Sequence, residues 1–253
     1  MFSAQDFAAR LAKREDRWSL LKDFVAEWHS PLQPGDGYST AELDAVEERL
    51  GLKLPAALRE WYQIAGHRKD IIAAQNFLRS PDRLYTREED SGNVLYFYTE
   101  NQAVVNWGIL ASDLELYDPP VYLDEIGAIE NQTLSEFVTQ MVVFETTCFG
   151  GAFGGNSSAN LEALEIVKQN FIPLGFPDWH WSDSCSRLYG GNGVLIETEA
   201  SENGYCWIWI GAQTRGALRD TAQLFSLDWE CLNLNESYEE NTQTHGREGL
   251  LRH

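Results

Sequence analysis

The chain has 253 residues, of which 43% are hydrophobic and 23% are charged, as in an ordinary folded globular protein and unlike a disordered one. Its 39 Asp and Glu residues outnumber its 19 Lys and Arg residues, which gives a formal net charge of −20. A field of this sign repels nucleic acids and anionic membranes and attracts basic partners. We therefore expect a protein partner, with no nucleic acid and no membrane.

The cysteines and the N-terminus bear on the compartment. Cys148, Cys185, Cys206 and Cys231 are widely spaced and form no CxxC pair, which argues against a zinc site and against a disulfide framework. The first residues lack the apolar run of a signal peptide, and no segment reaches the roughly 18 apolar residues of a membrane span. The sequence thus predicts a cytoplasmic protein with reduced thiols.

The N-terminal third is helical in pattern. Residues 1–30 carry apolar side chains at a helical period and predict one helix, an extension in front of the main domain. A loop rich in Pro and Gly follows at residues 30–38. Ser39 and Glu42 form a capping box that starts a second helix, which Gly51 ends. Pro55 suits the first turn of a third helix, and Gly66 ends that one.

The spacing of the apolar residues changes after residue 70. Residues 70–80 are ambiguous, whereas residues 93–100 and 103–110 are β-branched and aromatic and predict a hairpin. Residues 118–123, "DPPVYL", predict an edge strand, because proline is tolerated there.

The second half of the chain again begins with helical patterns and continues with strand patterns. Residues 133–148 predict a helix, with a capping box between Thr133 and Glu136. Residues 150–158, "GGAFGGNSS", predict a flexible loop and the only candidate domain boundary. A helix is expected at 159–171, followed by strands at 185–191, 193–200 and 205–213, the last two joined by a turn at 201–204. Residues 216–225 form a short, ambiguous segment.

The order of helices, strands, helices and strands predicts an α+β fold. We expect a mostly antiparallel β-sheet of about five to seven strands flanked by helices. The domain organisation follows as an N-terminal helical extension at 1–30, an α+β domain at 31–228, and a polar acidic tail at 229–253.

The sequence contains no convincing catalytic, cofactor or metal motif. Cys148 and His180 could form a nucleophile and base, but Cys148 continues an apolar helical stripe. The glycine-rich segment after Cys148 lacks the Lys-Ser/Thr of a phosphate loop and follows a helix rather than a strand. The five histidines have no metal-ligand spacing. We expect no enzyme and no cofactor, and an enzyme with an unrecognised site remains an alternative.

Three segments together resemble the SUKH superfamily, which includes proteins similar to the fungal Smi/Knr-type cell-wall-assembly regulators. They are "STAELDAVEERLGLKLPAALREWYQIAG" at 39–66, "LYFYTENQAVVNWGILASDLELYDPPVYL" at 95–123, and "TLSEFVTQMVVFET" at 133–146. The match is best over residues 39–147. The resemblance implies a SUKH-like α+β fold without catalysis. Bacterial members are commonly immunity proteins that bind a polymorphic toxin, often a nuclease, and fungal members are regulatory scaffolds.

The resemblance and the charge favour an immunity protein that neutralises a basic toxin by binding, with a cytoplasmic regulatory scaffold as the alternative. Neither the toxin nor the oligomeric state follows from the sequence. The residues that carry the family signature are expected to be structural: Gly51, Leu54, Pro55, Trp61, Tyr62, Gly66, Trp107, Pro119 and Pro120. The predicted partner-binding residues are Glu88, Glu89, Asp90, Glu100, Asn101, Gln102 and Asp118. Acidic residues at 236–240 are a further candidate for electrostatic steering.

Overall fold

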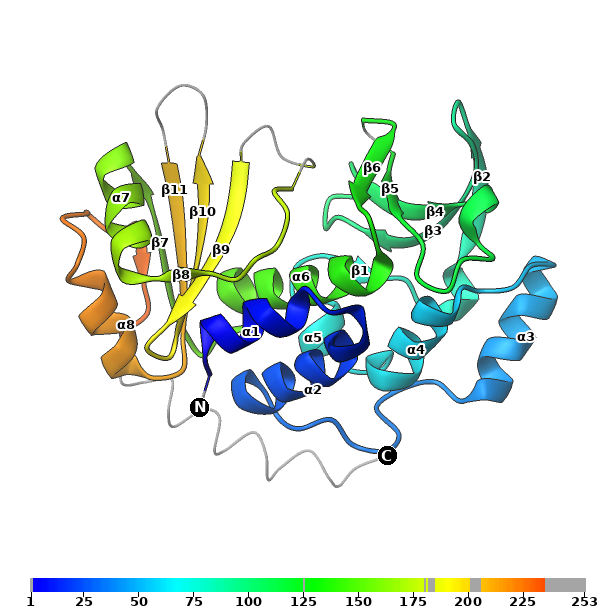
Figure 1. Cartoon of the computed structure of the whole chain (residues 1–253), viewed down its shortest axis with the longest axis horizontal. Coiled ribbons are helices and arrows are strands. Elements are labelled where there is room, and N and C mark those ends of the chain that lie inside the picture. The colour runs from blue at the N-terminus through cyan, green and yellow to red at the C-terminus, as the bar shows by residue number, and fades with distance from the viewer. Residues whose placement is uncertain (1, 125, 180, 182–184, 201–205, 235–253) are drawn as a thin grey trace, which may run out of the picture.

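The computed structural model describes residues 2–234, apart from residues 125, 180, 182–184 and 201–205. The predicted α+β class and the antiparallel pairing are confirmed (Figure 1). The described residues form two antiparallel six-stranded sheets, each within the expected strand number, rather than one. The predicted turn at 201–204 and the acidic residues at 236–240 lie outside the described residues.

The first half of the chain contains five helices and the strands of the first sheet. The helices are α1 Ala4–Leu11, α2 Arg17–Trp28, α3 Thr40–Leu50, α4 Ala56–Ala65 and α5 Lys69–Ile72. The strands are β1 Phe77–Leu78, β2 Tyr85–Glu89, β3 Gly92–Thr99, β4 Asn106–Leu110, β5 Val121–Leu123 and β6 Ala128–Asn131. Their order is β1-β3-β4-β5-β6, and β2 also pairs with β3.

The second half contains α6 Leu134–Glu145, a π-helical turn at Thr146–Gly150, and the second sheet. Its strands are β7 Phe153–Ala159, β8 Ile172–Pro173, β9 Cys185–Gly191, β10 Val194–Ala200, β11 Cys206–Ala212 and β12 Cys231–Leu232, in the order β12-β7-β11-β10-β9-β8. Helices α7 Leu161–Asn170 and α8 Arg215–Ala222 cover one face of this sheet (Figure 1).

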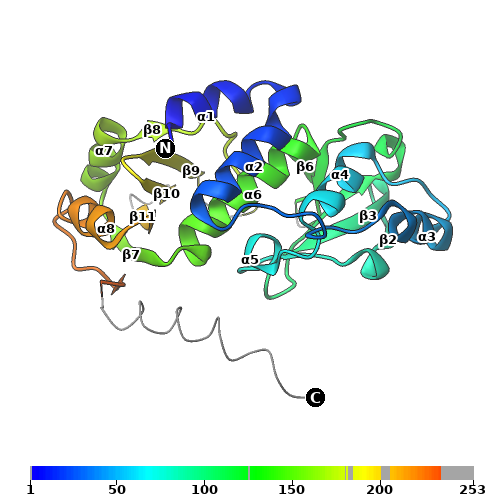
Figure 2. The same ribbon diagram turned by 90° about the horizontal axis from the view of Figure 1, so that it is seen from below.

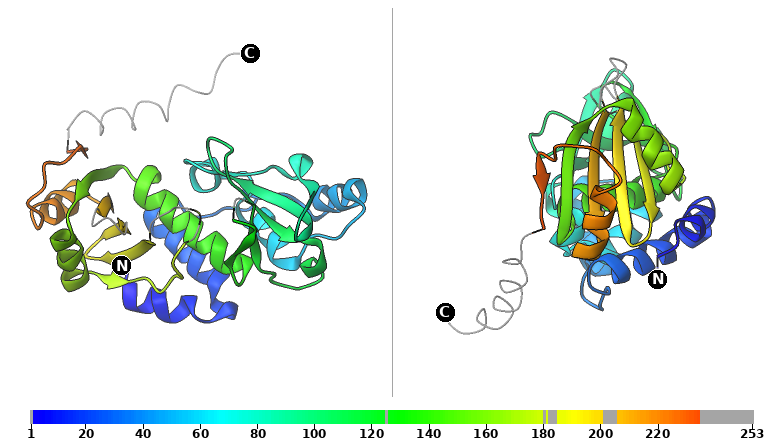
Figure 3. Two further views of the ribbon diagram at one scale, coloured as in Figure 1. Left: turned by 90° about the horizontal axis from the view of Figure 1, so that it is seen from above. Right: turned by 90° about the vertical axis from the view of Figure 1, so that its left-hand side faces the viewer.

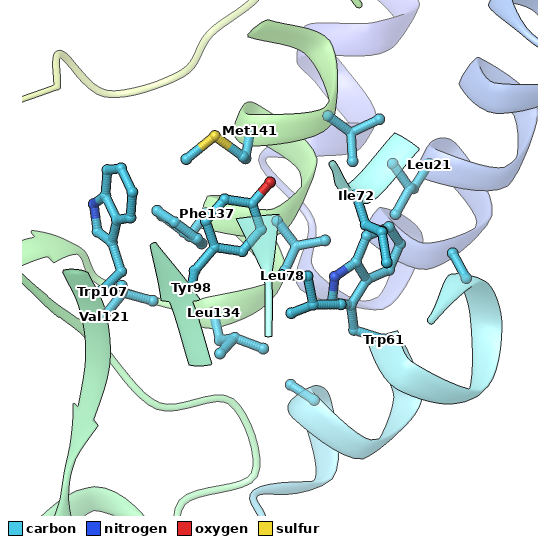
Figure 4. Packing of buried hydrophobic residues seen from close by; sticks show 14 of the residues in the cluster. Leu21, Trp61, Ile72, Leu78, Tyr98, Trp107, Val121, Leu134, Phe137 and Met141 are labelled. Atoms are coloured by element: carbon cyan, nitrogen blue, oxygen red, sulfur yellow. The ribbon is translucent and has the colours of Figure 1, made fainter. Parts of the chain in front are cut away.

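Helix α6 is the centre of the molecule. Every residue of it except Glu136 is buried, and it runs between the two sheets with α2 alongside (Figures 2 and 3). Figure 4 shows Phe137 of α6 beside Tyr98 of β3 and Trp107 of β4, with Met141 of α6 and Trp61 of α4 in the same buried cluster. Leu188 and Leu195 of the second sheet belong to the same buried cluster. One hydrophobic core therefore joins both sheets.

The single helix predicted for residues 1–30 is wrong. The polar stretch after Leu11 forms a short 3₁₀ turn, Arg14–Asp16, at which α1 turns back onto α2. The guanidinium of Arg17 stabilises this reversal, because its Nε donates a hydrogen bond to the carbonyl of Leu11 at 2.8 Å. Both helices contribute side chains such as Phe7 and Leu21 to the main core, so this segment is an integral layer of the fold.

Residues 153–158 are not the flexible loop that their composition predicts. They belong to β7, which lies between β11 and β12. A side chain at Gly155 would come within 2.7 Å of Leu232 and 2.9 Å of the carbonyl of Cys231. The glycine therefore allows β12 to approach, and the start of the predicted polar tail becomes a strand.

Residues 121–123 are likewise not an edge strand. β5 pairs with β4 on one side and with β6 on the other, and β6 takes the edge. The two prolines precede the strand, at positions that need no ladder hydrogen bond, so they are compatible with an interior strand.

Candidate functional site

Helix α3 and its two ends follow the local sequence signals. The backbone N–H of Ser39 donates to Glu42 Oε2 at 2.8 Å, and the N–H of Glu42 donates to Ser39 Oγ at 3.3 Å, which confirms the capping box. Gly51 ends the helix in the left-handed conformation, with φ of 68°. The chain then turns directly into the segment that leads to α4.

Glu47 joins α3 to α4. Its buried carboxylate accepts hydrogen bonds from Lys53 Nζ at 2.6 Å, the backbone N–H of Leu54 at 3.1 Å, and Arg59 Nη1 at 2.7 Å. Burial alone would raise the pKa of Glu47, but these three donors outweigh it and lower the pKa. The ion pair between Arg59 Nη2 and Asp44 Oδ1, at 2.9 Å, braces the same joint.

An open groove of about 940 Å³ lies along this joint. Helix α3, which lines it, lies at the outer end of the molecule (Figure 1). We call it the α3 groove. One wall is α3, and the other is the segment after β4, which comprises the 3₁₀ turn η3 Ala111–Asp113 and the following residues Leu114 and Glu115. The backbone N–H of Ala57 donates to the carbonyl of Tyr117 at 2.9 Å and holds this second wall against α4.

The α3 groove combines an apolar lining with an acidic rim. Ala45, Leu52 and Leu114 supply apolar surface. Four carboxylates line the groove, from Asp44, Glu47, Glu48 and Glu115, against the single ammonium group of Lys53. Asp44, Glu48 and Glu115 are exposed. Such a surface suits a basic, partly apolar protein segment.

Sequence reasoning missed these groove residues. Asp44 and Glu48 lie one helical turn apart on the outward face of α3, and this i,i+4 spacing was readable in the sequence. Glu115 is distant from Asp44 and Glu48 in the sequence. It lies in the same groove only because its segment packs on α4.

The predicted residues Glu88, Glu89 and Asp90 lie at the turn between β2 and β3. Glu89 accepts a hydrogen bond from Tyr96 Oη at 2.8 Å and pairs with Arg87, and both interactions lower its pKa. Glu88 and Asp90 are exposed. These two remain available to a partner, whereas Glu89 is tied to the sheet.

The predicted residues Glu100, Asn101 and Gln102 lie at the opposite end of β3, about 23 Å away for a strand of this length. The carboxylate of Glu100 accepts a hydrogen bond from the backbone N–H of Gln102 at 2.8 Å, and the N–H of Asn101 donates to Asn76 Oδ1 at 3.3 Å. These contacts build the turn. The structure therefore does not gather the two predicted clusters into one surface.

Asp118 has a structural position. Its side chain is only 6% exposed, and it accepts hydrogen bonds from the backbone N–H of Ser135 at 2.9 Å and from Ser135 Oγ at 2.6 Å. It thereby caps α6 from a distant segment. The predicted capping box between Thr133 and Glu136 is absent from α6, because Thr133 Oγ1 and the Glu136 carboxylate both face Arg17. Asp118 is therefore not part of the candidate partner surface.

The residues that the SUKH resemblance predicts to be structural lie at structural positions. Leu54, Trp61, Tyr62 and Trp107 are buried core side chains, and Pro55 and Pro119 are buried as well, with Pro120 half-buried. Gly51 ends α3, as described above. A side chain at Gly66 would meet the ring of Tyr38 at 2.5 Å and the carbonyl of Tyr62 at 2.6 Å. This position therefore needs glycine for close packing rather than for an unusual φ.

The nucleophile hypothesis gains no support. Cys148 lies in the π-helical turn after α6, and burial, together with the nearby carboxylates of Glu197 and Glu145, raises the pKa of its thiol. A thiol whose pKa is raised is a poor nucleophile at neutral pH. His180 lies outside the described residues. Among the residues that the structure describes, no group of three or more His, Cys, Asp or Glu side chains is placed to hold a metal ion.

The chain matches no protein-family model, no curated protein and no solved structure. Within its described part, no helix is both long enough and apolar enough to cross a membrane.

Proposed function

We propose that this protein is a non-enzymatic, cytoplasmic immunity protein of the SUKH kind, which neutralises a basic toxin by direct binding. The observation that carries this proposal is the α3 groove. The segment at 39–66 that resembles the SUKH signature builds one wall of a surface rimmed with exposed carboxylates, in a chain of formal net charge −20.

The physical chemistry favours a nuclease as the toxin. A nuclease must present basic groups to hold the phosphates of its substrate, and an acidic inhibitor attracts such a surface at long range. Charge complementarity of this kind accelerates association and makes it sensitive to salt, while apolar contacts slow dissociation. The α3 groove supplies both, since its acidic rim surrounds side chains such as Leu52 and Leu114.

Co-expression with a toxin encoded by a neighbouring gene tests the proposal. The unaltered protein should restore growth, and the charge-reversed variant Glu48→Lys/Glu115→Lys should protect less. The matched control is Glu88→Lys/Asp90→Lys, which changes net charge equally at the exposed β2–β3 turn. Protection that fails for the unaltered protein, or that is reduced equally by both double variants, would reject the groove as the binding surface.

A pull-down at low and high salt distinguishes the toxin from the regulatory partner of a scaffold. Capture that weakens as salt rises indicates a basic partner held by exposed charges, because salt screens interactions beyond the Debye length. Capture that persists unchanged indicates a mainly apolar scaffold contact and contradicts the immunity proposal.

A further inference from the structure

The second sheet carries a separate feature on the face that is turned away from α7 and α8. The register pairs Glu197 of β10 with Trp209 of β11, and Glu199 with Trp207. Side chains alternate along a strand, so these four residues project from the same face. The opposite face carries apolar side chains such as Ile196 and Ile208, which pack beneath the two helices. Carboxylates and indoles therefore alternate in a two-by-two arrangement, which we call the β10–β11 patch.

Glu197 is the unusual member of the β10–β11 patch. It is 2% exposed, and Oε1 accepts a hydrogen bond from Ser186 Oγ at 2.6 Å. Its Oε2 is buried without a hydrogen-bond partner anywhere in the described part of the chain. Burial raises the pKa of Glu197 to about 8, and Glu199 contributes in the same direction. A buried carboxylate oxygen without a donor is costly, and such atoms are rare in folded proteins.

The aromatic members of the patch are less buried than Glu197. The ring centroids of Trp207 and Trp209 are 6.4 Å apart, with an interplanar angle of 49°, and both side chains are half-buried. Phe149 extends the aromatic surface, with its ring 5.2 Å from that of Trp209, and it is 39% exposed. The aromatic surface thus runs from solvent at Phe149 to the indoles beside Glu197.

We propose that the β10–β11 patch receives an arginine side chain of the protein partner, with the two indoles as its stacking surfaces and Glu197, which releases its proton to solvent on binding, as its counter-ion. A cation within about 6 Å of an indole ring is stabilised by the ring electrons. A guanidinium group is planar, stacks on aromatic faces, and presents paired N–H donors that match a carboxylate. One of these donors would satisfy Oε2. This inference rests on the proposed function, because it names the chemistry by which a basic partner is held.

The probe is N-acetyl-arginine amide, and its neutral isostere N-acetyl-citrulline amide is the matched ligand control. Titration of the full chain with the arginine probe should quench tryptophan fluorescence saturably, and citrulline should not. The variant Glu197→Gln retains the shape of the side chain and should weaken arginine binding at least about ten-fold, the scale of one charged hydrogen bond. Glu162→Gln, on α7 at the opposite face of the second sheet, should bind as the unaltered protein does.

Equal quenching by arginine and citrulline would overturn the inference, as would unchanged affinity in Glu197→Gln or the absence of saturable binding. If Glu197→Gln does not fold, as judged by circular dichroism, Trp207→Leu replaces it: weakened binding supports the site and unchanged binding rejects it. Failure of this test can be distinguished from failure of the proposed function. The probe needs no toxin, so probe binding without toxin protection removes only the function, and protection without probe binding removes only this site.

Discussion

Asp118 and Ser135 join two segments that have no local reason to meet. The carboxylate of Asp118 accepts hydrogen bonds from both the backbone N–H and the hydroxyl of Ser135, in the first turn of the buried helix α6. Arg14, which precedes α2, donates its Nε–H to the same carboxylate at 3.1 Å. One side chain thus fixes the N-terminus of α6 against both the first sheet and the N-terminal helices.

Replacing Asp118 with Ala should lower the free energy of unfolding by about 2 kcal/mol or more. The variant loses a helix cap and leaves the Ser135 N–H and Arg14 without their acceptor. Urea denaturation measures the change. The exposed-site control Glu88→Ala should remain within about 0.5 kcal/mol of the unaltered protein. An Asp118→Ala variant that is equally stable would show that the cap has no role in the fold.

Gly51 and its left-handed conformation support a second prediction. A Cβ at this position meets no atom within 4 Å, so the cost of substitution comes from backbone strain alone. Gly51→Ala should destabilise the protein by about 1 kcal/mol, and Gly51→Asn should cost less, because Asn tolerates this conformation better. Thermal unfolding of the two variants gives the order. Equal stability of Gly51→Ala and the unaltered protein would contradict the assigned role.

The sequence predicts well the parts of the fold that depend on neighbours in the chain. The capping box at Ser39, the stop at Gly51 and the β3–β4 hairpin all arise from local backbone preferences. Asp118 differs, because its role depends on Ser135 and on Arg14, more than 100 residues before it. The prediction of a loop at residues 153–158 is wrong for a related reason. Glycines indicate a loop when the segment is considered alone, but Gly155 is required here by the close approach of a neighbouring strand.

The candidate site likewise contains some residues that the sequence indicates and others that only the fold brings together. The charge of the chain and the outward carboxylates of α3 are visible in the sequence, but the second wall of the α3 groove is not. Glu115 contributes to it only because its segment packs on α4. The sequence does not indicate the burial of Glu197 either, because its strand has an ordinary β-strand pattern. The side chain is buried in a region where the π-helical turn after α6 packs against β10 and β11.

Two buried carboxyl groups near the junction of the sheets predict a dependence of stability on pH. Burial raises the pKa of Glu145 to about 7 and that of Glu197 to about 8, from an ordinary value of 4.5. The folded state therefore favours the protonated acids. Their contribution to stability is complete below pH 4.5 and declines as the pH rises through the folded-state pKa values.

Glu197→Gln should remove the part of this decline that belongs to Glu197. We expect the variant to exceed the unaltered protein in stability at pH 9 by at least about 1 kcal/mol, since one unit of pKa corresponds to about 1.4 kcal/mol. The difference should shrink as the pH falls toward 4.5. Chemical denaturation across this range measures it, and parallel curves for the two proteins would show that Glu197 titrates normally.

The account assigns toxin recognition to the acidic rim of the α3 groove, and the rate of association tests that assignment most directly. The association rate constant of the purified toxin would be measured by stopped-flow fluorescence at a series of salt concentrations. The account predicts that the rate falls steeply with salt, and that Glu48→Lys/Glu115→Lys slows it by about ten-fold or more at low salt. Glu88→Lys/Asp90→Lys should have a clearly smaller effect. An association rate that is independent of salt, or equal for the two double variants, would contradict the account.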